Sequence, residues 1–396
     1  MMSEYFVKKL INGQDEKENQ KISLKDGLIS DVSAMDGAAP DETYAYAIPG
    51  LIDVHTNGRE SFDMMSCDAE EWDKLAASFL KVGVTSFVGT LTTSPLEKLD
   101  QCLQIGEVFL KENKKKAGRG ERAEMIGFHI EGPWISNLNR GAHNPDYIIE
   151  PDEKTFEMVR RHADVIKKIT FSYHTKGARK FLEVMKECDI VPAAGHDCAI
   201  DADAVEGFKN GITSVTHAHC STASFQRVNG FKHLGTLEMA LITEGVTVEI
   251  IADGFHITKY FWDFIRHNKS VDDIIVISDS SYCAGLPNDP NVIYDFNGKE
   301  TLVDNGVVWL KDRSTFAGSA ADLHGIFKRL VLEWGVSLTD AVKMTCYNPA
   351  RQMKIENVTG SIAKGYQADL LLLDEDLNIQ KIIKSGCEVC GQRPDS

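Results

Sequence analysis

The sequence has no excess of basic residues and no long apolar segment. Its 396 residues include 43 Lys and Arg against 59 Asp and Glu, which gives a formal net charge of −16. Nucleic-acid binding depends on clustered Lys and Arg, so this balance argues against a nucleic-acid partner. No apolar run approaches the roughly 20 residues that span a bilayer. We therefore expect no nucleic-acid partner and no membrane partner, and we expect the basic run 111–122 to be a solvated loop.

The N-terminal segment lacks the pattern of a secretion signal. MMSEYFVKKL is not followed by an apolar stretch and a cleavage site. The nine cysteines are odd in number and scattered along the chain. These features predict a cytoplasmic protein with reduced thiols. The single CxxC, from Cys387 to Cys390, has no second pair at zinc-finger spacing, so these two cysteines are expected to be structural.

Internal repeats, low-complexity segments and Gly-rich phosphate loops are also absent. The chain instead alternates short β-branched runs with amphipathic helical stretches over most of its length. This alternation is typical of a parallel sheet with crossover helices, and its eight βα units predict an α/β fold of the (β/α)8 TIM barrel type. The candidate strands are 47–55, 84–91, 124–132, 166–174, 189–196, 212–219, 246–254 and 273–280.

The two ends of the chain differ in texture from this central region. Both read as short strands and turns, so we expect residues 1–49 and 355–396 to pair into a small β-sandwich domain beside a barrel of residues 50–354. Segment 306–319 is expected to be the connection after the eighth strand. The stretch 337–353 is predicted to be a helix, because Ser337 and Asp340 resemble a capping box at its start.

Polar residues stand at the ends of several predicted strands. In TIM barrels the active site lies at the carboxyl ends of the strands, so these side chains should meet in one mouth. A single histidine at a strand end is usually a hydrogen-bonded structural residue, but the convergence of imidazoles and carboxylates predicts a site for Zn²⁺ or another divalent transition metal. The residues concerned are His55, Asn57, His129, Glu131, His196, His217, His219, Asp253, His256 and Asp279.

A series of short motifs carries a family resemblance. In this order along the chain, the motifs resemble those of the N-acetylglucosamine-6-phosphate deacetylase family in the amidohydrolase superfamily. The resemblance extends from PGLIDVH near the start to QADLLLLD near the end. HIEGP followed by GAHNP is specific to this group, whereas DVH or ADL alone marks the wider superfamily. The motifs are HIEGPWIS (129–136), GAHNP (141–145), GH (195–196), TH (216–217), IADGFHI (251–257), ISDS (277–280), FAGS (316–319) and NPAR (348–351).

The resemblance implies a set of metal ligands. Many amidohydrolases use a carbamylated lysine on the fourth strand, whereas this family uses a glutamate on the third strand, which Glu131 matches. His196 and His217 match the two histidine ligands, and Lys167 and Lys168 are then expected to be structural or surface residues. The implied cofactor is a divalent ion, Zn²⁺ or Fe²⁺, with one ion per subunit.

The first strand departs from the pattern that supports a second metal ion. It carries His55, Thr56 and Asn57 where a two-histidine pair would stand. Because this strand carries one imidazole, His55 is a further candidate metal ligand, and the presence of a second metal ion stays an open question. The alternative is that His55 does not bind the metal and instead forms a hydrogen bond to a residue that does.

The resemblance also implies the catalytic and substrate-binding residues. Asp279 matches the aspartate that acts first as general base and then as general acid. His143 matches the histidine that polarises the acyl carbonyl. His256 matches a histidine that contacts the substrate. The segment Phe316, Ala317 and Gly318 is expected to border the sugar, together with Ala142.

The largest departure follows the sixth strand. The family typically reads THLFNAM, in which the Asn-Ala pair helps to hold the substrate phosphate, whereas this chain reads THAHCST. Cys220 and Ser221 replace that pair, and His219 lies beside them, so all three are candidate substrate contacts. Arg227 is a candidate match for an arginine that reaches the phosphate from a neighbouring subunit of a homodimer. A purely structural arginine is an equal alternative.

These observations predict a metal-dependent deacetylase of amino sugar catabolism. The expected reaction converts N-acetylglucosamine 6-phosphate to glucosamine 6-phosphate and acetate. THAHCST changes the residues that are expected to contact the substrate. The alternative is therefore an amidohydrolase that acts on another N-acyl amino sugar or on a cyclic amide. A third possibility is a non-catalytic binding protein with the amidohydrolase fold.

Overall fold

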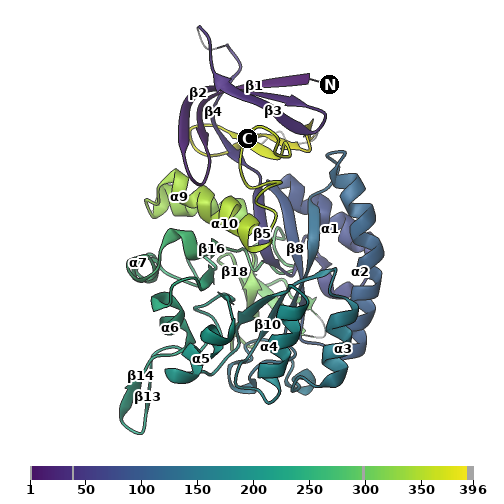
Figure 1. The fold of residues 1–396 in the computed structure, drawn as a ribbon, viewed down its shortest axis with the longest axis vertical. Helices are drawn as coiled ribbons and strands as arrows, with labels where there is room; N and C mark the ends of the chain where they lie inside the picture. Colours follow the sequence, from purple (N-terminus) through teal and green to yellow (C-terminus); the bar gives the residue numbers. More distant parts are fainter. Residues whose placement is uncertain (1, 38–39, 297–298, 390–396) are drawn as a thin grey trace.

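The centre of the fold is a parallel sheet of eight strands, seen in the computed structural model of Figure 1. The structure describes residues 2–37, 40–296 and 299–389. The strand order is β16-β15-β12-β11-β10-β9-β8-β5. A parallel bridge from Thr56 of β5 to Ser280, four residues after β16, brings the two edges of the sheet together in a nearly closed barrel. The strands are β5 (Leu51–Thr56), β8 (Val84–Thr92), β9 (Glu124–Glu131), β10 (Ile166–Phe171), β11 (Val191–Ala194), β12 (Ser214–Val215), β15 (Thr247–Ile250) and β16 (Ile274–Val276).

Helices between the strands form the outer layer of the barrel (Figure 1). In α1, Trp72, Leu75, Phe79 and Leu80 form an apolar face that is buried in the main core. This arrangement confirms the predicted TIM barrel. The helices are α1 (Ala69–Lys81), α2 (Leu96–Ala117), α3 (Glu153–Arg161), α4 (Ala178–Glu187), α5 (Ala202–Asn210), α6 (Thr236–Ile242), α7 (Lys259–Asn268) and α8 (Leu323–Lys328).

A seven-stranded sheet from both ends of the chain lies beside the barrel, at the top of Figure 1. Its order is β23-β22-β21-β4-β1-β2-β3, and it has its own buried core around Leu10, Ile22 and Leu370. The predicted strand 47–55 divides at Gly50, because its first three residues belong to this sheet. The strands are β1 (Met2–Ile11), β2 (Glu16–Lys25), β3 (Leu28–Ala34), β4 (Thr43–Pro49), β21 (Leu370–Leu373), β22 (Ile379–Lys384) and β23 (Cys387–Glu388).

Two segments differ from their predicted form. Segment 306–319, expected to be a connection, forms half of a four-stranded antiparallel sheet made of β17 (Tyr294–Phe296), β18 (Lys299–Asp304), β19 (Val307–Leu310) and β20 (Phe316–Ser319). The basic run 111–122 begins inside α2 rather than in a loop, because Asn113 and Ala117 are buried on its inner face. In α2, burial of the inner face outweighs the local polar composition.

The predicted helix 337–353 forms with the expected N-cap. The Ser337 hydroxyl accepts a hydrogen bond of 3.1 Å from the backbone N–H of Asp340. The helix runs from α9 (Leu338–Val342) through a π-helical turn, η6 (Lys343–Tyr347), into α10 (Asn348–Gln352). Within the described ranges, no helix is both long and apolar enough to cross a bilayer.

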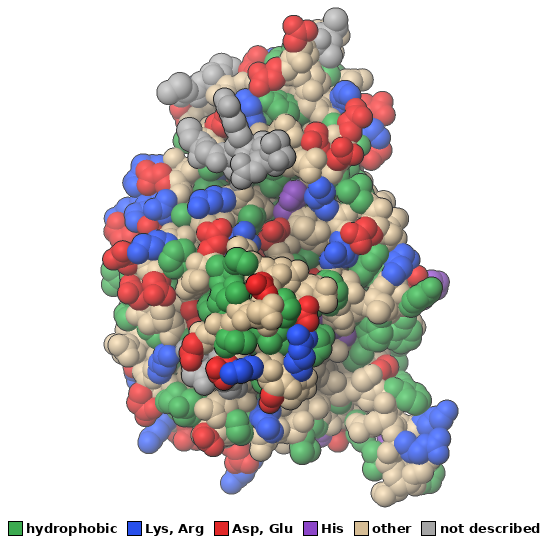
Figure 2. Space-filling model, turned by 180° about the vertical axis from the view of Figure 1, so that it is seen from behind, with side chains coloured by type: hydrophobic (Ala, Val, Ile, Leu, Met, Phe, Trp, Pro, Cys, Tyr) green, Lys and Arg blue, Asp and Glu red, His purple; other side chains and the backbone are tan. Residues whose placement is uncertain are grey.

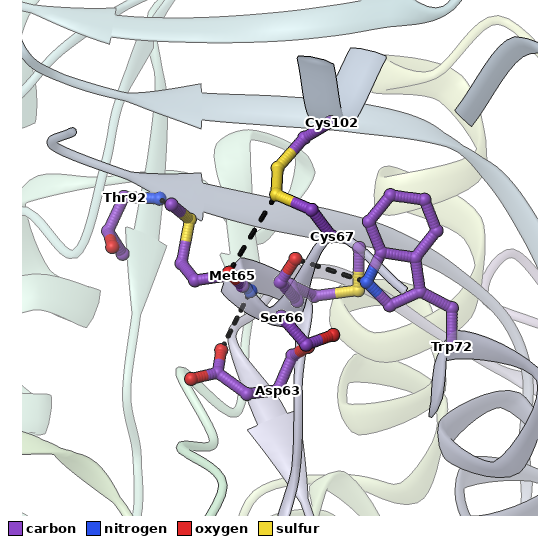
Figure 3. The surroundings of a disulfide bond; sticks show 8 residues. Asp63, Met65, Ser66, Cys67, Trp72, Thr92 and Cys102 are labelled. Carbon is purple, nitrogen blue, oxygen red and sulfur yellow. Dashed lines mark hydrogen bonds between the residues drawn. A yellow bond between two sulfur atoms is a disulfide. The ribbon is translucent and has the colours of Figure 1, made fainter. Parts of the chain in front are cut away.

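The expectation of reduced thiols is wrong for one pair of cysteines. Cys67 and Cys102 form a disulfide, shown in Figure 3, and their Cα atoms are 4.8 Å apart. Cys67 follows the short helix η1 (Met64–Ser66), and Cys102 lies on α2, so the contact depends on tertiary packing that spacing does not reveal. Cys387 is exposed and free, and Cys390 lies outside the described residues.

Candidate active site

A cavity of about 530 Å³ opens at the carboxyl ends of the barrel strands. Most of the residues predicted to form the site line it, including all three predicted metal ligands and both predicted catalytic residues. The predicted residues that line it are Asn57, Glu131, Ala142, His143, His196, His217, Cys220, Ser221, His256, Asp279, Phe316, Ala317 and Gly318.

Glu131, at the end of β9, is the centre of the polar cluster. Its Oε1 atom lies 2.7 Å from Nε2 of His217 and 3.1 Å from Nε2 of His196. Its Oε2 atom lies 3.8 Å from Nε2 of His143 and 3.5 Å from Nε2 of His55. Two groups of three ligand atoms therefore converge at this carboxylate, one with His55 and His217 and the other with His143 and His196.

Backbone carbonyls orient the two predicted histidine ligands. Nδ1 of His196 lies 2.9 Å from the carbonyl oxygen of Asn139, and Nδ1 of His217 lies 3.2 Å from that of Cys220. A carbonyl only accepts hydrogen bonds, so each Nδ1 carries a proton and each Nε2 directs its remaining site toward Glu131. Two imidazole nitrogens and a carboxylate oxygen facing one point are a donor set that fits a divalent metal ion.

The electrostatics of this point favour a positive charge. Burial alone would lower the pKa of His217, but the hydrogen bond and charge of Glu131 raise it to about 9. Burial alone would raise the pKa of Glu131, but the neighbouring His55, His196 and His217 hold it well below its ordinary value. The carboxylate is therefore ionised, and the cluster attracts either a proton or a metal cation.

Asp279 follows β16 and lines the same cavity. The Asn57 side-chain amide donates a 2.9 Å hydrogen bond to its Oδ1 atom, and Nε2 of His55 lies 3.3 Å from the same oxygen. His55 is fully buried, and among the described residues its ring nitrogens make no hydrogen bond of good geometry. His55 therefore lies between the two carboxylates that bracket the cluster.

Three of the site residues have a left-handed backbone. The φ angles are 47° at His196, 28° at His217 and 47° at Asp279. Each residue comes two or three positions after the end of its strand, where the chain turns away from the barrel. For a non-glycine residue such a conformation costs about 1–3 kcal/mol and is concentrated at functional sites. The left-handed backbone at these three residues thus lowers the folding stability and sets the direction of their side chains.

The predicted substrate contacts form the upper wall of the cavity. His256 is oriented by Asp253, whose Oδ2 lies 2.7 Å from Nδ1, and its ring packs against Phe316 with centroids 4.9 Å apart. Gly318 has φ +81° and approaches the backbone of Asp279 closely, since an added Cβ would lie 3.0 Å from that carbonyl oxygen. Glycine is required at this position on both counts.

Some predicted residues lie outside the cavity. His219 does not line it; the ring nitrogens are buried and have no hydrogen-bond partner in the described part of the chain. Arg227 is exposed on the hairpin β13 (Gln226–Val228) and β14 (Phe231–His233), away from this chain's own cavity. His129 is buried and bonds to threonine hydroxyls on β8 and β10.

Of the two lysines near the fourth strand, Lys168 is internal. It is fully buried, and its Nζ lies 2.8 Å from each carboxylate oxygen of Glu249. Lys167 bonds to the carbonyl oxygen of Asp164 at the surface. Neither lysine lines the cavity.

One stretch that lines the cavity was not predicted. Thr92 pairs in register with Glu131, so the residues after β8 continue directly onto the cavity wall. This stretch reads TTSPLEK, and the only local signal was its position after a predicted strand. The lining residues not predicted as part of the site are Thr92, Thr93, Ser94, Pro95, Lys98, Gly141, Asn144, Tyr147, Ser281, Leu310 and Thr315.

Comparisons with known proteins agree with this geometry. A sequence profile of the Amidohydrolase family matches residues 46–389. An N-acetylglucosamine-6-phosphate deacetylase from Lysinibacillus sphaericus is 26% identical over 383 residues, which cover 95% of each chain. An N-acetylgalactosamine-6-phosphate deacetylase from Escherichia coli O157:H7 is 24% identical, over 95% of this chain and 96% of that one.

A solved structure extends the agreement to the fold. The N-acetylglucosamine-6-phosphate deacetylase of Thermotoga maritima superposes with a TM-score of 0.84 at 27% identity, over 99% of this chain and 100% of that one. The chain therefore belongs to the amidohydrolase family, and its predicted resemblance to the N-acetylglucosamine-6-phosphate deacetylases within that family is confirmed.

Proposed function

We propose that this protein is a metal-dependent hydrolase that converts N-acetylglucosamine 6-phosphate to glucosamine 6-phosphate and acetate. The observation that carries the proposal is the convergence of Glu131, His196 and His217 next to Asp279 in one cavity. Relatives that match nearly the whole chain are named for deacetylation of amino sugar 6-phosphates. The reaction belongs to amino sugar catabolism.

The metal ion is assigned to Glu131, His196 and His217. A divalent ion bound there would polarise the acyl carbonyl and acidify the attacking water. We propose Zn²⁺, with Fe²⁺ as the alternative, because imidazole and carboxylate ligands suit both ions. We assign one ion per subunit. His55 is the candidate ligand for a second, because it approaches both Glu131 and Asp279 within 3.5 Å.

Asp279 is assigned the proton transfers. It accepts a proton as water adds to the acyl carbon, and it returns that proton to the nitrogen as the carbon–nitrogen bond breaks. The amide of Asn57 holds Oδ1 by a 2.9 Å hydrogen bond, which fixes the carboxylate in the cavity. His143 is assigned to stabilise the oxygen that becomes negative on the acyl group.

We further propose that the protein works as a homodimer in the cytoplasm. The β13–β14 hairpin projects from the barrel in Figures 1 and 2, and it exposes Phe225, Val228 and Phe231 beside Arg227. Exposed apolar side chains on a projecting hairpin favour burial against a second copy. The cytoplasmic location follows from the substrate, because a charged sugar phosphate does not cross a bilayer unaided.

A different N-acyl amino sugar, or a cyclic amide, is the second candidate substrate. Cys220 and Ser221 line the cavity and replace the Asn-Ala pair of the family pattern. This change alters the substrate contacts and leaves the metal cluster intact, so it favours a shift of substrate over loss of catalysis.

Release of acetate from N-acetylglucosamine 6-phosphate by metal-replete protein tests the proposed function. The Asp279→Asn variant should lose at least about a thousandfold in kcat while it keeps its metal content and its thermal unfolding midpoint. If turnover of this substrate is negligible and another N-acyl compound is cleaved rapidly, that compound replaces N-acetylglucosamine 6-phosphate as the proposed substrate. Failure with every N-acyl compound would favour a binding protein.

A further inference from the structure

Lys98 is a charged residue of the cavity that the chemistry described above does not use. It lies in the first turn of α2 and lines the cavity. Among the described lining residues, it is the only lysine or arginine. The carboxylates that line the cavity are Glu131 and Asp279, and both belong to the metal and proton-transfer cluster.

In the part of the chain that the structure describes, Lys98 has no carboxylate partner, a property that it shares with the exposed Lys111 on the same helix; its place on the cavity wall is what distinguishes it. Lys115 pairs with Glu112 at 2.6 Å, and Lys116 pairs with Asp73 at 2.8 Å. Within the described ranges, no hydrogen bond or ion pair holds the Lys98 ammonium group. The chain has a net charge of −16, so carboxylates are plentiful at its surface. A cationic residue on the wall of a cavity that is left unpaired there is available to an anionic ligand.

The backbone around Lys98 is firmly held. Thr92 continues the register of β8 with Glu131, and the chain passes through Ser94 and Pro95, which also line the cavity, into α2. The next turn of α2 buries Leu99, Cys102 and Leu103 in the main core. The start of α2 is thus fixed relative to the metal cluster, and only the flexible Lys98 side chain needs to move to reach a ligand.

Arg227 does not supply this charge within the same chain. It is exposed on the β13–β14 hairpin and does not line the cavity. Cys220 and Ser221, which also line the cavity, are neutral side chains and supply no positive charge. In one chain, Lys98 is therefore the positive group of the cavity wall outside the histidine cluster.

We propose that Lys98 binds the phosphate group of the substrate and thereby sets the preference for phosphorylated amino sugars. The inference rests on the proposed function and deepens it by naming the residue that recognises the anion. An ammonium group donates charge-assisted hydrogen bonds to phosphate oxygens. A sugar that lacks the phosphate gains nothing from this contact.

The test compares N-acetylglucosamine 6-phosphate with N-acetylglucosamine as substrates of four proteins. Lys98→Met should lower kcat/KM for the phosphorylated sugar about 10- to 100-fold, mainly through KM, and change that for the unphosphorylated sugar less than about twofold. Lys98→Arg should recover part of the loss. Lys111→Met removes an exposed lysine from the same helix and should match the wild type.

The opposite results would overturn the inference. Unchanged discrimination in Lys98→Met, or an equal loss on both substrates, would exclude phosphate recognition by Lys98. A loss of discrimination in Arg227→Met but not in Lys98→Met would assign the role to the hairpin. Wild-type protein that cleaves both sugars equally would refute the inference while leaving the deacetylase function standing.

A binding measurement keeps the inference testable without turnover. Calorimetry with metal-loaded protein compares glucosamine 6-phosphate with glucosamine. The phosphorylated sugar should bind at least about tenfold more tightly to the wild type, and Lys98→Met should remove that difference. Equal affinities in wild type and Lys98→Met would overturn the role of Lys98. Failure of every N-acyl sugar as a substrate would instead refute the proposed function.

Discussion

At the scale of single residues, a proton and a metal cation compete for one atom of the proposed metal site, Nε2 of His217. Nδ1 of His217 faces the carbonyl of Cys220, so the additional proton resides on Nε2, which lies 2.7 Å from Glu131. Without metal, the pKa of His217 is raised to about 9, because Glu131 outweighs the effect of burial. A metal ion at Nε2 must displace this proton.

Metal uptake should therefore release about one proton per ion at pH 7, and the apparent affinity should rise about tenfold per pH unit up to about pH 9. The same protonation stabilises the metal-free fold below pH 6.5, and that contribution is lost as the pH rises through 9, since the folded-state pKa is the higher one. Calorimetry in two buffers of different ionisation enthalpy measures the proton count. A count near zero, or an affinity independent of pH, would contradict this assignment.

The residues of this cluster could be predicted, whereas Lys98 could not. His196, His217 and Asp279 each follow a predicted strand, and in a parallel barrel all strand ends meet at one rim. Lys98 lies six residues beyond the end of its strand, inside a helix. Its direction depends on where α2 begins and which helix face is buried, and these details are fixed by packing rather than by local sequence.

At the scale of elements, the disulfide ties η1 to the helix that carries Lys98. It joins residues that are 35 positions apart and closes a loop that contains all of α1 and β8. Around it, the Trp72 indole donates to the carbonyl of Met64, and the backbone N–H of Thr92 donates to the sulfur of Met65, as Figure 3 shows in part. The bridge is therefore part of a packed structural unit below the cavity.

Opening this bridge should destabilise the protein by about 3–4 kcal/mol, because the unfolded chain regains the entropy of a long loop. Denaturant unfolding with and without a thiol reductant measures the difference, read as a lower midpoint, with a steeper slope because the reduced unfolded chain is less compact. The Cys67→Ser/Cys102→Ser double variant should match the reduced wild type, and reductant should not change it further. A midpoint that ignores reductant in the wild type would mean that the bridge adds no stability.

Periodicity predicted most strands and helices of the barrel but missed the β17–β20 sheet. The strands of the barrel are short runs of β-branched residues that are buried on both faces, so their signal is strong. The β17–β20 sheet was missed because 306–319 follows the last barrel strand and carries Gly306, Lys311, Asp312 and Arg313, which are typical of a loop. Val307 nevertheless pairs with Asp304 across the two-residue turn Asn305-Gly306, which is a local signal of a β-hairpin, so this part of the sheet was predictable from the sequence.

At the scale of the whole molecule, the exposed side chains of the β13–β14 hairpin provide a test of the proposed homodimer. Phe231 is 73% exposed, and Phe225 and Val228 are exposed with it on the hairpin segment that projects from the barrel. Phe231→Glu should weaken the proposed homodimer, because it introduces a charge into a surface that must be desolvated on association.

Light scattering across a dilution series measures the effect on assembly. The wild type should have the mass of two chains, and the variant should dissociate at a concentration about tenfold or more higher. Val108→Glu provides the control, since Val108 is similarly exposed at 67% on α2, on the other side of the barrel in Figure 1. A wild-type mass of one chain at all concentrations would refute the homodimer.

The order of strands in the terminal sheet has a consequence for synthesis on the ribosome. β4 lies between β1 and β21, so its second edge stays unpaired until residues 50 to 369 have been translated. At about 5–20 residues per second this interval lasts on the order of tens of seconds. During that time the nascent chain carries an open strand edge beside a growing barrel. We expect a chaperone that shields exposed strands to contact this protein during translation rather than after its release.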